Sequence, residues 1–255
     1  MNLFRRAQES RWRWFIEGLP SIPRALALFH ARRFTMTNPA RCRHLWNMCN
    51  DVLSEDVPGD FVECGVWRGG SAGVMGLALK HRRANRILHL FDSFEGLPEP
   101  TIEDGTFAAE YSGGRASGAL NSVDQCRSIL SEVRDFLLGR LHLDNALVRF
   151  HVGWFQNTVP STAPKMGPIS VLRLDGDWFE STRICLEYLY PLLSPGGAII
   201  LDDFHAWEGC AKAVEQFREK YSITAPIHRI DQEAVFWRVP RGSMQAAALA
   251  GDGSP

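Results

Sequence analysis

The chain has 255 residues, a formal net charge of −1 and 22% charged residues. Its length suits one large α/β domain with a sizeable core, and its nearly neutral charge gives no general attraction to nucleic acid. No run of about 18 apolar residues occurs, so no transmembrane segment is expected. The six cysteines form no C-x-x-C pair, a pattern typical of reduced core thiols in a cytoplasmic protein.

The N-terminal segment is basic and aromatic. The first 33 residues carry seven arginines, with Trp12, Trp14 and Phe15 between them. Such a helix can lie on an anionic membrane or target the protein to an organelle, or it can pack on the body or on a second subunit. Glu9 and Glu17 interrupt the pattern, which favours packing and is compatible with a homo-oligomer.

Strand and helix patterns alternate between the two ends of the chain. Residues 1–57 are expected to form a helical lead-in, 58–240 the main domain, and 241–255 a disordered tail. The predicted strands are 61–66, 87–91, 147–152, 169–174, 198–201, 227–230 and 234–239, and the predicted helices are 71–81, 122–138, 181–193 and 208–221. This alternation predicts a doubly wound, mostly parallel α/β sheet.

Capping residues and one long loop complete this prediction. Ser122 and Ser181 are expected to cap the helices that follow them. Residues 96–120 are rich in glycine, proline and acids and show no element of their own. Because a loop of this length next to a ligand-binding edge is usually functional, it is expected to be a lid.

Carboxylates follow two of the predicted strands. Asp175 comes directly after the fourth strand, and Asp202 and Asp203 come directly after the fifth. Since the carboxyl ends of neighbouring parallel strands meet at one edge of the sheet, these side chains should lie together. Clustered carboxylates repel one another, so such a site usually holds a hard cation such as Mg²⁺.

A cation at this edge would lower the pKa of a substrate hydroxyl and so prepare it as a nucleophile. His205, two residues after the acidic pair, could accept the proton, although an ordinary loop histidine fits the sequence equally well. Asp177 is compatible with three roles: a base, a substrate ligand, or an acid at a helix start.

A strand, a glycine turn and a helix start lie between Glu63 and Ser71. Glycines allow a ligand to approach the backbone closely, and a helix start offers free N–H groups. Gly65, Gly69 and Gly70 do not have the G-x-G-x-x-G spacing, which argues against an NAD(P)-dependent oxidoreductase. Because a buried carboxylate is costly, Glu63 should bond either a ligand or nearby N–H groups.

Two further positions suit a nucleoside. Asp92 ends the second predicted strand, where an acidic side chain commonly accepts hydrogen bonds from both ribose hydroxyls. The alternative is an Asx turn into the loop. After the third strand, Gly153, Trp154 and Phe155 could sandwich a flat base, although a plain aromatic core gives the same spacing.

In combination these segments resemble one family, the macrocin-type (TylF-like) S-adenosylmethionine-dependent O-methyltransferases, which act on sugar hydroxyls. The matching segments are Gly59–Ser71, Phe91–Pro98, Gly153–Pro160, Leu172–Thr182 and Leu189–Asp203. The similarity runs from about Thr35 to about Arg238.

The resemblance implies a Rossmann-like class I methyltransferase fold with a seven-stranded sheet and an N-terminal helical segment that folds over the cofactor. The implied cofactor-binding residues are Thr35, Glu63, Gly65, Val66, Ser71, Asp92, Ser93, Gly153 and Trp154. Asp175, Asp202 and Asp203 would bind Mg²⁺. Combined with the position of His205 after the acidic pair, this makes Asp175 and His205 the candidate catalytic residues.

The leading hypothesis is therefore a Mg²⁺-dependent O-methyltransferase whose acceptor is a small molecule or glycoside, such as a sugar in a glycosylated metabolite or polysaccharide. An oxidoreductase and a non-catalytic binding protein on the same fold are the alternatives. Phe179 and Phe204 stand where the family often has tyrosine, and Asn157 where it often has an acid. These departures concern the substrate pocket and remove none of the proposed metal ligands.

Overall fold

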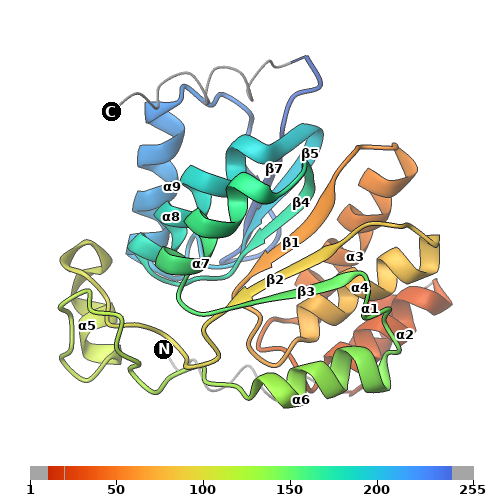
Figure 1. Cartoon of the computed structure of the whole chain (residues 1–255), viewed down its shortest axis with the longest axis horizontal. Helices are drawn as coiled ribbons and strands as arrows, with labels where there is room; N and C mark the ends of the chain where they lie inside the picture. The colour runs from red at the N-terminus through yellow and green to blue at the C-terminus, as the bar shows by residue number, and fades with distance from the viewer. Residues whose placement is uncertain (1–10, 20, 243–255) are drawn as a thin grey trace.

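A central seven-stranded sheet organises the protein (Figure 1). The computed structural model describes residues 11–19 and 21–242. The strands are β1 (Asp60–Cys64), β2 (Leu88–Asp92), β3 (Val148–Val152), β4 (Ile169–Leu174), β5 (Leu193–Leu201), β6 (His228–Arg229) and β7 (Val235–Arg238). Their order is β3-β2-β1-β4-β5-β7-β6. The first five are parallel, whereas β7 runs antiparallel to both β5 and β6. The predicted doubly wound, mostly parallel sheet is confirmed.

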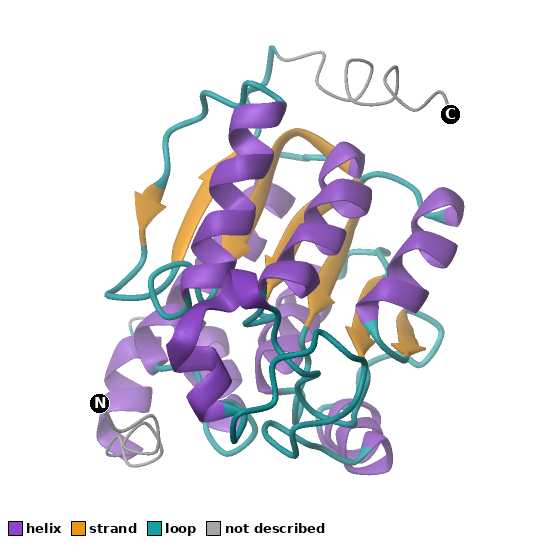
Figure 2. Ribbon diagram, turned by 90° about the vertical axis from the view of Figure 1, so that its left-hand side faces the viewer, coloured by secondary structure: helices purple, strands orange, loops and turns teal. Residues whose placement is uncertain are grey.

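The helices form a layer on each face of the sheet. They are α1 (Arg11–Gly18), α2 (Ile22–Ala31), α3 (Pro39–Ser54), α4 (Gly70–Arg82), α5 (Gly105–Tyr111), α6 (Leu130–Arg134), α7 (Phe155–Thr162), α8 (Phe179–Leu189) and α9 (Glu208–Lys220). Helices α1 to α4 cover one face, and α7 to α9 cover the other (Figures 1 and 2). None of the helices in the described ranges is long and apolar enough to cross a membrane.

Alternating strand residues build two hydrophobic cores. Phe61 and Ile200 face the first core with α3 and α4, whereas Val62 and Ile199 face the second core with α8 and α9. Strands buried on both faces need apolar residues at successive positions, which explains the continuous apolar runs in the sequence. The first core also contains Trp14 from α1, so the helical lead-in packs directly on the sheet.

The strand order reverses between β1 and β4, the two neighbours in the middle of the sheet. The chain leaves β1 toward α4 on one face and leaves β4 toward α8 on the other (Figure 1). A crevice opens at the carboxyl ends of the strands where such connections diverge. This reversal therefore fixes where a ligand can bind.

Two of the predicted helix starts are wrong. The helix expected from Ser122 begins as α6 at Leu130, because Asp124 and Cys126 have φ values of 62° and 57°, which no right-handed helix allows. The Ser122 hydroxyl instead accepts a hydrogen bond from the Asp124 N–H at 3.0 Å. Ser181 lies inside α8, which begins at Phe179.

The segment 96–120 is not structureless, as the sequence suggested. It contains a 3₁₀ turn (Ile102–Asp104) followed directly by α5. Asp104 accepts from the Thr101 N–H at 2.7 Å and from the Phe179 N–H at 2.5 Å. Its carboxylate thereby ties this segment to the start of α8.

Helix α7, directly after β3, was not predicted, because Gly153 and Pro160 argue against a helix there.

Acidification should destabilise the fold through His44 on α3. This ring packs on Phe236 with a centroid separation of 4.4 Å, its Nδ1 is buried without a partner, and burial lowers its pKa to about 4. The unfolded chain therefore binds a proton at higher pH than the folded one, so stability present above about pH 6.5 is lost as the pH falls toward 4.

The comparison of melting temperatures across pH 7 to 4 checks this. His44→Gln should melt at a temperature that falls less steeply on acidification than the wild type does. His30→Gln, which replaces an exposed histidine of α2, should follow the wild-type profile. Parallel profiles for His44→Gln and the wild type would contradict the assignment.

Candidate active site

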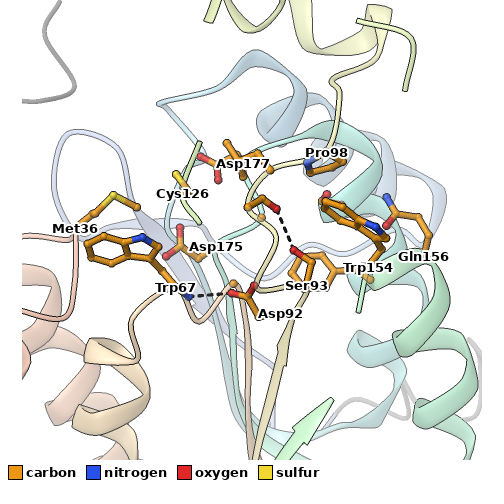
Figure 3. Close-up of a pocket in the computed structure, with 16 residues that line it drawn as sticks. Met36, Trp67, Asp92, Ser93, Pro98, Cys126, Trp154, Gln156, Asp175 and Asp177 are labelled. Atoms are coloured by element: carbon orange, nitrogen blue, oxygen red, sulfur yellow. Dashed lines mark hydrogen bonds between the residues drawn. The ribbon is translucent and has the colours of Figure 1, made fainter. Parts of the chain in front are cut away.

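A cavity lies at the carboxyl ends of β1, β2, β3 and β4 (Figure 3). Five of the predicted site residues line it: Gly65, Asp92, Ser93, Trp154 and Asp175. They come from four separate strand ends, which only the parallel sheet brings together. The cavity opens into a larger groove of about 1020 Å³, with which it shares Trp67, Asp175 and Asp177, and the groove gives the site room for a nucleoside-sized ligand.

Asp92, at the end of β2, holds the glycine turn in place. Its Oδ2 accepts from the backbone N–H groups of Trp67 (2.9 Å; Figure 3) and Val66 (2.7 Å), and its Oδ1 accepts from the Phe94 N–H at 2.6 Å. The predicted Asx turn is thus present, and the side chain still lines the cavity. A carboxylate has about four lone-pair directions, so acceptor capacity remains for a ligand.

The glycine turn passes very close to β4. A Cβ at Gly65 would lie 1.8 Å from the carbonyl oxygen of Asp175, and its φ of 90° favours glycine. Trp67 follows with a φ of 46° and lines the cavity. The close approach of the two strand ends places the turn directly beside the acidic edge.

Residues 34–36 of the lead-in lie over the start of α4. The Gly70 N–H donates to the Phe34 carbonyl at 2.8 Å, and the Thr35 and Ser71 hydroxyls are 3.5 Å apart. Thr35 lines a larger groove that also contains Trp67 and Asp175 and is therefore continuous with the cavity. The N-terminal segment thus forms one wall of the site.

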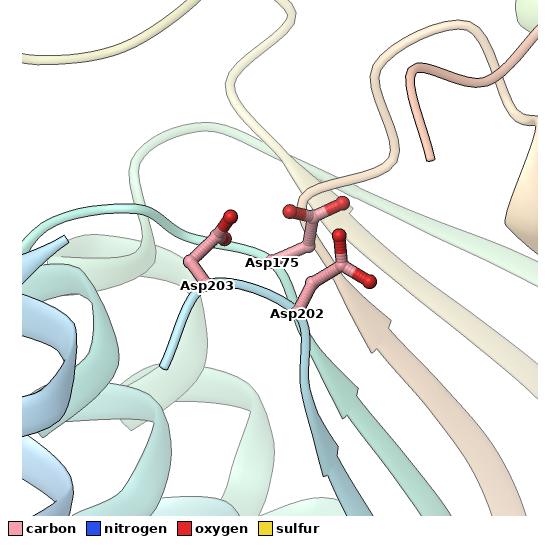
Figure 4. Close-up of side chains that lie close together, drawn as sticks. All are labelled: Asp175, Asp202 and Asp203. Atoms are coloured by element: carbon pink, nitrogen blue, oxygen red, sulfur yellow. The ribbon is translucent and has the colours of Figure 1, made fainter. Parts of the chain in front are cut away.

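The predicted acidic cluster is present. Ligand atoms of Asp175, Asp202 and Asp203 all lie within 4.8 Å of one another (Figure 4). The Asp203 Oδ2 is buried and has no hydrogen-bond partner. Burial, and the neighbouring charges of Asp177 and Asp175, raise the pKa of Asp203 well above its usual range.

Arg173, next to the carboxyl end of β4, holds three acids at this edge. Its Nη1 lies 2.9 Å from Glu63 Oε1, and its Nη2 lies 2.9 Å from Asp175 Oδ2 and 2.9 Å from Asp202 Oδ1. The arginine is almost fully buried, and Glu63 is fully buried. Burial raises the pKa of Glu63 to about 8 despite the arginine.

A second arginine reaches the cluster from α3. The Arg41 Nη1 lies 2.6 Å from Asp202 Oδ2, and its Nε lies 2.6 Å from Asp231 Oδ2. Burial alone would raise the pKa of Asp202, but Arg173 and Arg41 outweigh it and hold that pKa below its usual range. Each oxygen of Asp202 therefore faces one guanidinium.

Several predicted residues do not line the cavity or the groove. They are Glu63, Val66, Ser71, Gly153 and His205. The Val66 N–H donates to Asp92, and Glu63 accepts from Arg173. These two residues therefore hold lining residues in place without lining the cavity themselves. His205 is exposed, and Arg229 donates to its Nε2 at 3.2 Å. The structure therefore does not bring His205 to the site as the proton acceptor that the sequence suggested.

Asp177 is better placed for that role. It lines both the cavity and the groove, and its Oδ1 accepts from the Trp207 Nε1 at 2.7 Å. Its φ of 56° is uncommon for a residue with a side chain. The hydrogen bond from Trp207 and the backbone conformation together fix the direction of this carboxylate.

Other lining residues escaped the sequence analysis. Met36 precedes α3, Cys126 belongs to the segment before α6, and Gln156 is the second residue of α7 (Figure 3). Trp67 lies within the recognised glycine turn and was open to prediction. Cys126 was not, because nothing in the sequence indicates that its loop returns to the sheet edge.

Comparison with known proteins identifies the family. Residues 29–239 match the family model of macrocin O-methyltransferase (TylF). The chain belongs to this O-methyltransferase family. The resemblance stated from the sequence is confirmed, and the oxidoreductase and non-catalytic alternatives are set aside.

Relatives and solved structures agree with this membership. A Streptomyces olivaceus enzyme named 8-demethyl-8-(2,3-dimethoxy-alpha-L-rhamnosyl)-tetracenomycin-C 4'-O-methyltransferase is 41% identical over 206 residues, 80% of this chain and 75% of its own. Demethyldecarbamoylnovobiocin O-methyltransferase from Streptomyces niveus is 37% identical, over 83% of this chain and 78% of its own. The structure of the O-methyltransferase NovP superposes with a TM-score of 0.70 at 36% identity, covering 82% of this chain and 83% of that one. The class I methyltransferase fold is thereby confirmed.

Removing Arg173 should strongly destabilise this O-methyltransferase. Arg173→Met leaves Glu63, Asp175 and Asp202 without their shared counter-charge, and breaking a buried ion pair costs about 3–5 kcal/mol. Urea unfolding of the wild type and the variant measures the loss.

Arg183→Met is the matched control for this experiment. Arg183 pairs with Glu180 and Glu187 on the partly exposed side of α8, where such pairs contribute about 0–1 kcal/mol. Equal losses in the two variants would show that the Arg173 cluster has no special role in the fold.

Proposed function

We propose that this enzyme transfers a methyl group from S-adenosylmethionine to a sugar hydroxyl of a glycosylated metabolite, with Mg²⁺ at the acidic cluster. The observation that carries the proposal is the Asp175–Asp202–Asp203 cluster, which lines the groove continuous with the cavity that holds Asp92. The names of two relatives support the acceptor class: one is the rhamnosyl-tetracenomycin enzyme, and another is a mycinamicin III 3''-O-methyltransferase from Micromonospora griseorubida.

The cavity suits S-adenosylmethionine. Asp92 offers remaining acceptor capacity to ribose hydroxyls, Trp154 borders the space expected for the adenine, and the glycine turn leaves room at Gly65. Thr35 and Ser71 lie together at the start of α4, where they can meet the amino-acid end of the donor. The lead-in would then act as a lid over the bound donor, with residues 34–36 as the closing part.

The acidic cluster suits a hard divalent cation. Asp203 carries a buried, unpartnered oxygen, and carboxylate oxygens are the ligands that Mg²⁺ takes in proteins. Asp175 and Asp202 would complete the ligand set, although Arg173 and Arg41 already neutralise part of their charge. Because of this competition, the cation should bind with modest affinity.

The chain's own residues then supply positioning and a proton acceptor. When bound, Mg²⁺ would lower the pKa of an acceptor hydroxyl. Asp177, held by Trp207, takes the proton from that hydroxyl as its oxygen forms a bond to the donor methyl group. The methyl–sulfur bond breaks in the same step, and its electron pair stays on sulfur. Walls formed by Trp67, Trp154 and residues 96–98 hold the two reactants in contact.

Asp92 should be required for donor binding. Asp92→Asn removes the charge of the carboxylate that accepts hydrogen bonds from the glycine turn and would accept them from the ribose hydroxyls. Binding of S-adenosylhomocysteine should therefore weaken by about 2–3 kcal/mol. Isothermal titration measures the change. Asp124→Asn, on the exposed loop before α6, should bind like the wild type. A folded Asp92→Asn protein with wild-type affinity would refute the assignment.

Methyl transfer should require a divalent cation. Chelation with EDTA should stop turnover, and Mg²⁺ should restore it. Asp203→Asn should raise the Mg²⁺ concentration needed for half-maximal rate, because it removes the unpartnered ligand oxygen. Asp177→Asn should lower kcat without changing that Mg²⁺ concentration. Full-rate turnover in chelated enzyme would refute the metal site and leave Asp177 as the only assigned chemical group.

A further inference from the structure

The larger groove, which is lined by Thr35 and continuous with the cavity, has walls of opposite charge. Asp175, Asp177, Asp202 and Asp203 line it at the sheet edge. Its other wall carries arginines from three segments: Arg33 precedes residue 34 of the lead-in, Arg68 follows the glycine turn, and Arg140 ends the π-helical turn η3 (Asp135–Arg140). This basic wall takes no part in the proposed chemistry.

Two of these arginines share one aromatic ring. The guanidinium carbon of Arg68 lies 5.4 Å from the centroid of the Phe34 ring, and that of Arg140 lies 5.7 Å from it. The ring itself stacks on Phe136 with a centroid separation of 3.9 Å. The Phe34 ring, held by Phe136, therefore keeps the guanidinium groups of Arg68 and Arg140 close together on this wall.

The guanidinium charges on this wall lack counter-charges. Within the described residues, Arg33, Arg68 and Arg140 form no ion pair, and all three are exposed. Glu132 and Asp135 line the same groove, yet neither pairs with them. Cation–π contacts at exposed sites contribute only about 0.5–1 kcal/mol and do not cancel charge. An anionic ligand group would do so.

We infer that Arg33, Arg68 and Arg140 form an anion subsite for a phosphate-bearing acceptor, most simply a sugar linked through a diphosphate. A guanidinium fork matches phosphate oxygens in pairs, and a diphosphate offers enough oxygens for several arginines. The inference rests on the proposed function, because the groove connects this wall with the carboxylates where the reacting hydroxyl would lie. Such an acceptor differs from the glycosides named for the relatives.

The donor's own carboxylate is the competing occupant of this wall. The two can be separated, because the arginines line the groove and not the cavity that holds Asp92. Titration of pyrophosphate into protein saturated with S-adenosylhomocysteine, without Mg²⁺, leaves only the acceptor side open. The wild type should bind pyrophosphate under these conditions.

Arg68→Gln and Arg140→Gln should each weaken pyrophosphate binding about tenfold, the scale for one charged hydrogen bond. Arg134→Gln is the matched control: Arg134 ends α6, lies over the Phe150 ring at 5.1 Å and does not line the groove. It should bind pyrophosphate like the wild type. All three variants should keep wild-type affinity for S-adenosylhomocysteine.

Three results would overturn the inference: no pyrophosphate binding by the wild type, an equal loss in Arg134→Gln, or weaker S-adenosylhomocysteine binding in Arg68→Gln. The last would assign the wall to the donor carboxylate. None of them would refute the proposed methyl transfer, which the Asp92 and Mg²⁺ experiments test separately.

Competition by dTDP and by farnesyl diphosphate distinguishes the two possible sources of the diphosphate, a nucleotide and a lipid. Tighter binding of dTDP than of pyrophosphate indicates a nucleotide-linked sugar, and tighter binding of farnesyl diphosphate indicates a lipid-linked one.

Discussion

The buried guanidinium of Arg173 is the interaction on which the site depends. It lies in the middle of the sheet and contacts carboxylates at the ends of three neighbouring strands: Glu63 on β1, Asp175 after β4 and Asp202 after β5. Without it, these acids could not share one dry edge, since burial raises the pKa of unpaired carboxylates. Together with Arg41, the arginine holds the pKa of Asp202 below its usual range, whereas burial and neighbouring acids raise the pKa of Asp203.

Arg41 extends this network from the sheet to the lead-in. It joins Asp202 to Asp231 and Glu233, which lie in the turn between β6 and β7. Helix α3 is therefore fixed by charge at its first turn as well as by the apolar core. Residues 34–36 lie just before the N-cap of α3, so Arg41 anchors to the acidic edge the helix that follows the Thr35–Ser71 contact.

The sequence predicted the sheet and the acidic edge well, because both follow from local patterns: apolar runs buried on two faces, and carboxylates directly after them. It could not predict contacts made between distant segments. Arg173 looked like one polar residue in an apolar strand, and only the strand order shows that it meets Glu63 110 positions away. The sequence offered both His205 and Asp177 as proton acceptors without deciding between them, whereas in the structure Arg229 donates to His205 and Asp177 lines the cavity.

Part of the backbone strain lies at the same place. Of the nine non-glycine residues with positive φ among those described, Trp67, Cys126 and Asp177 line the cavity. Such conformations cost about 1–3 kcal/mol each and persist only where surrounding contacts enforce them. The Asp92 carboxylate enforces one at Trp67, and the Trp207 indole fixes the side chain of Asp177. The protein therefore accepts strain and crowded charge at the candidate site, and the two hydrophobic cores supply the stability that makes this tolerable.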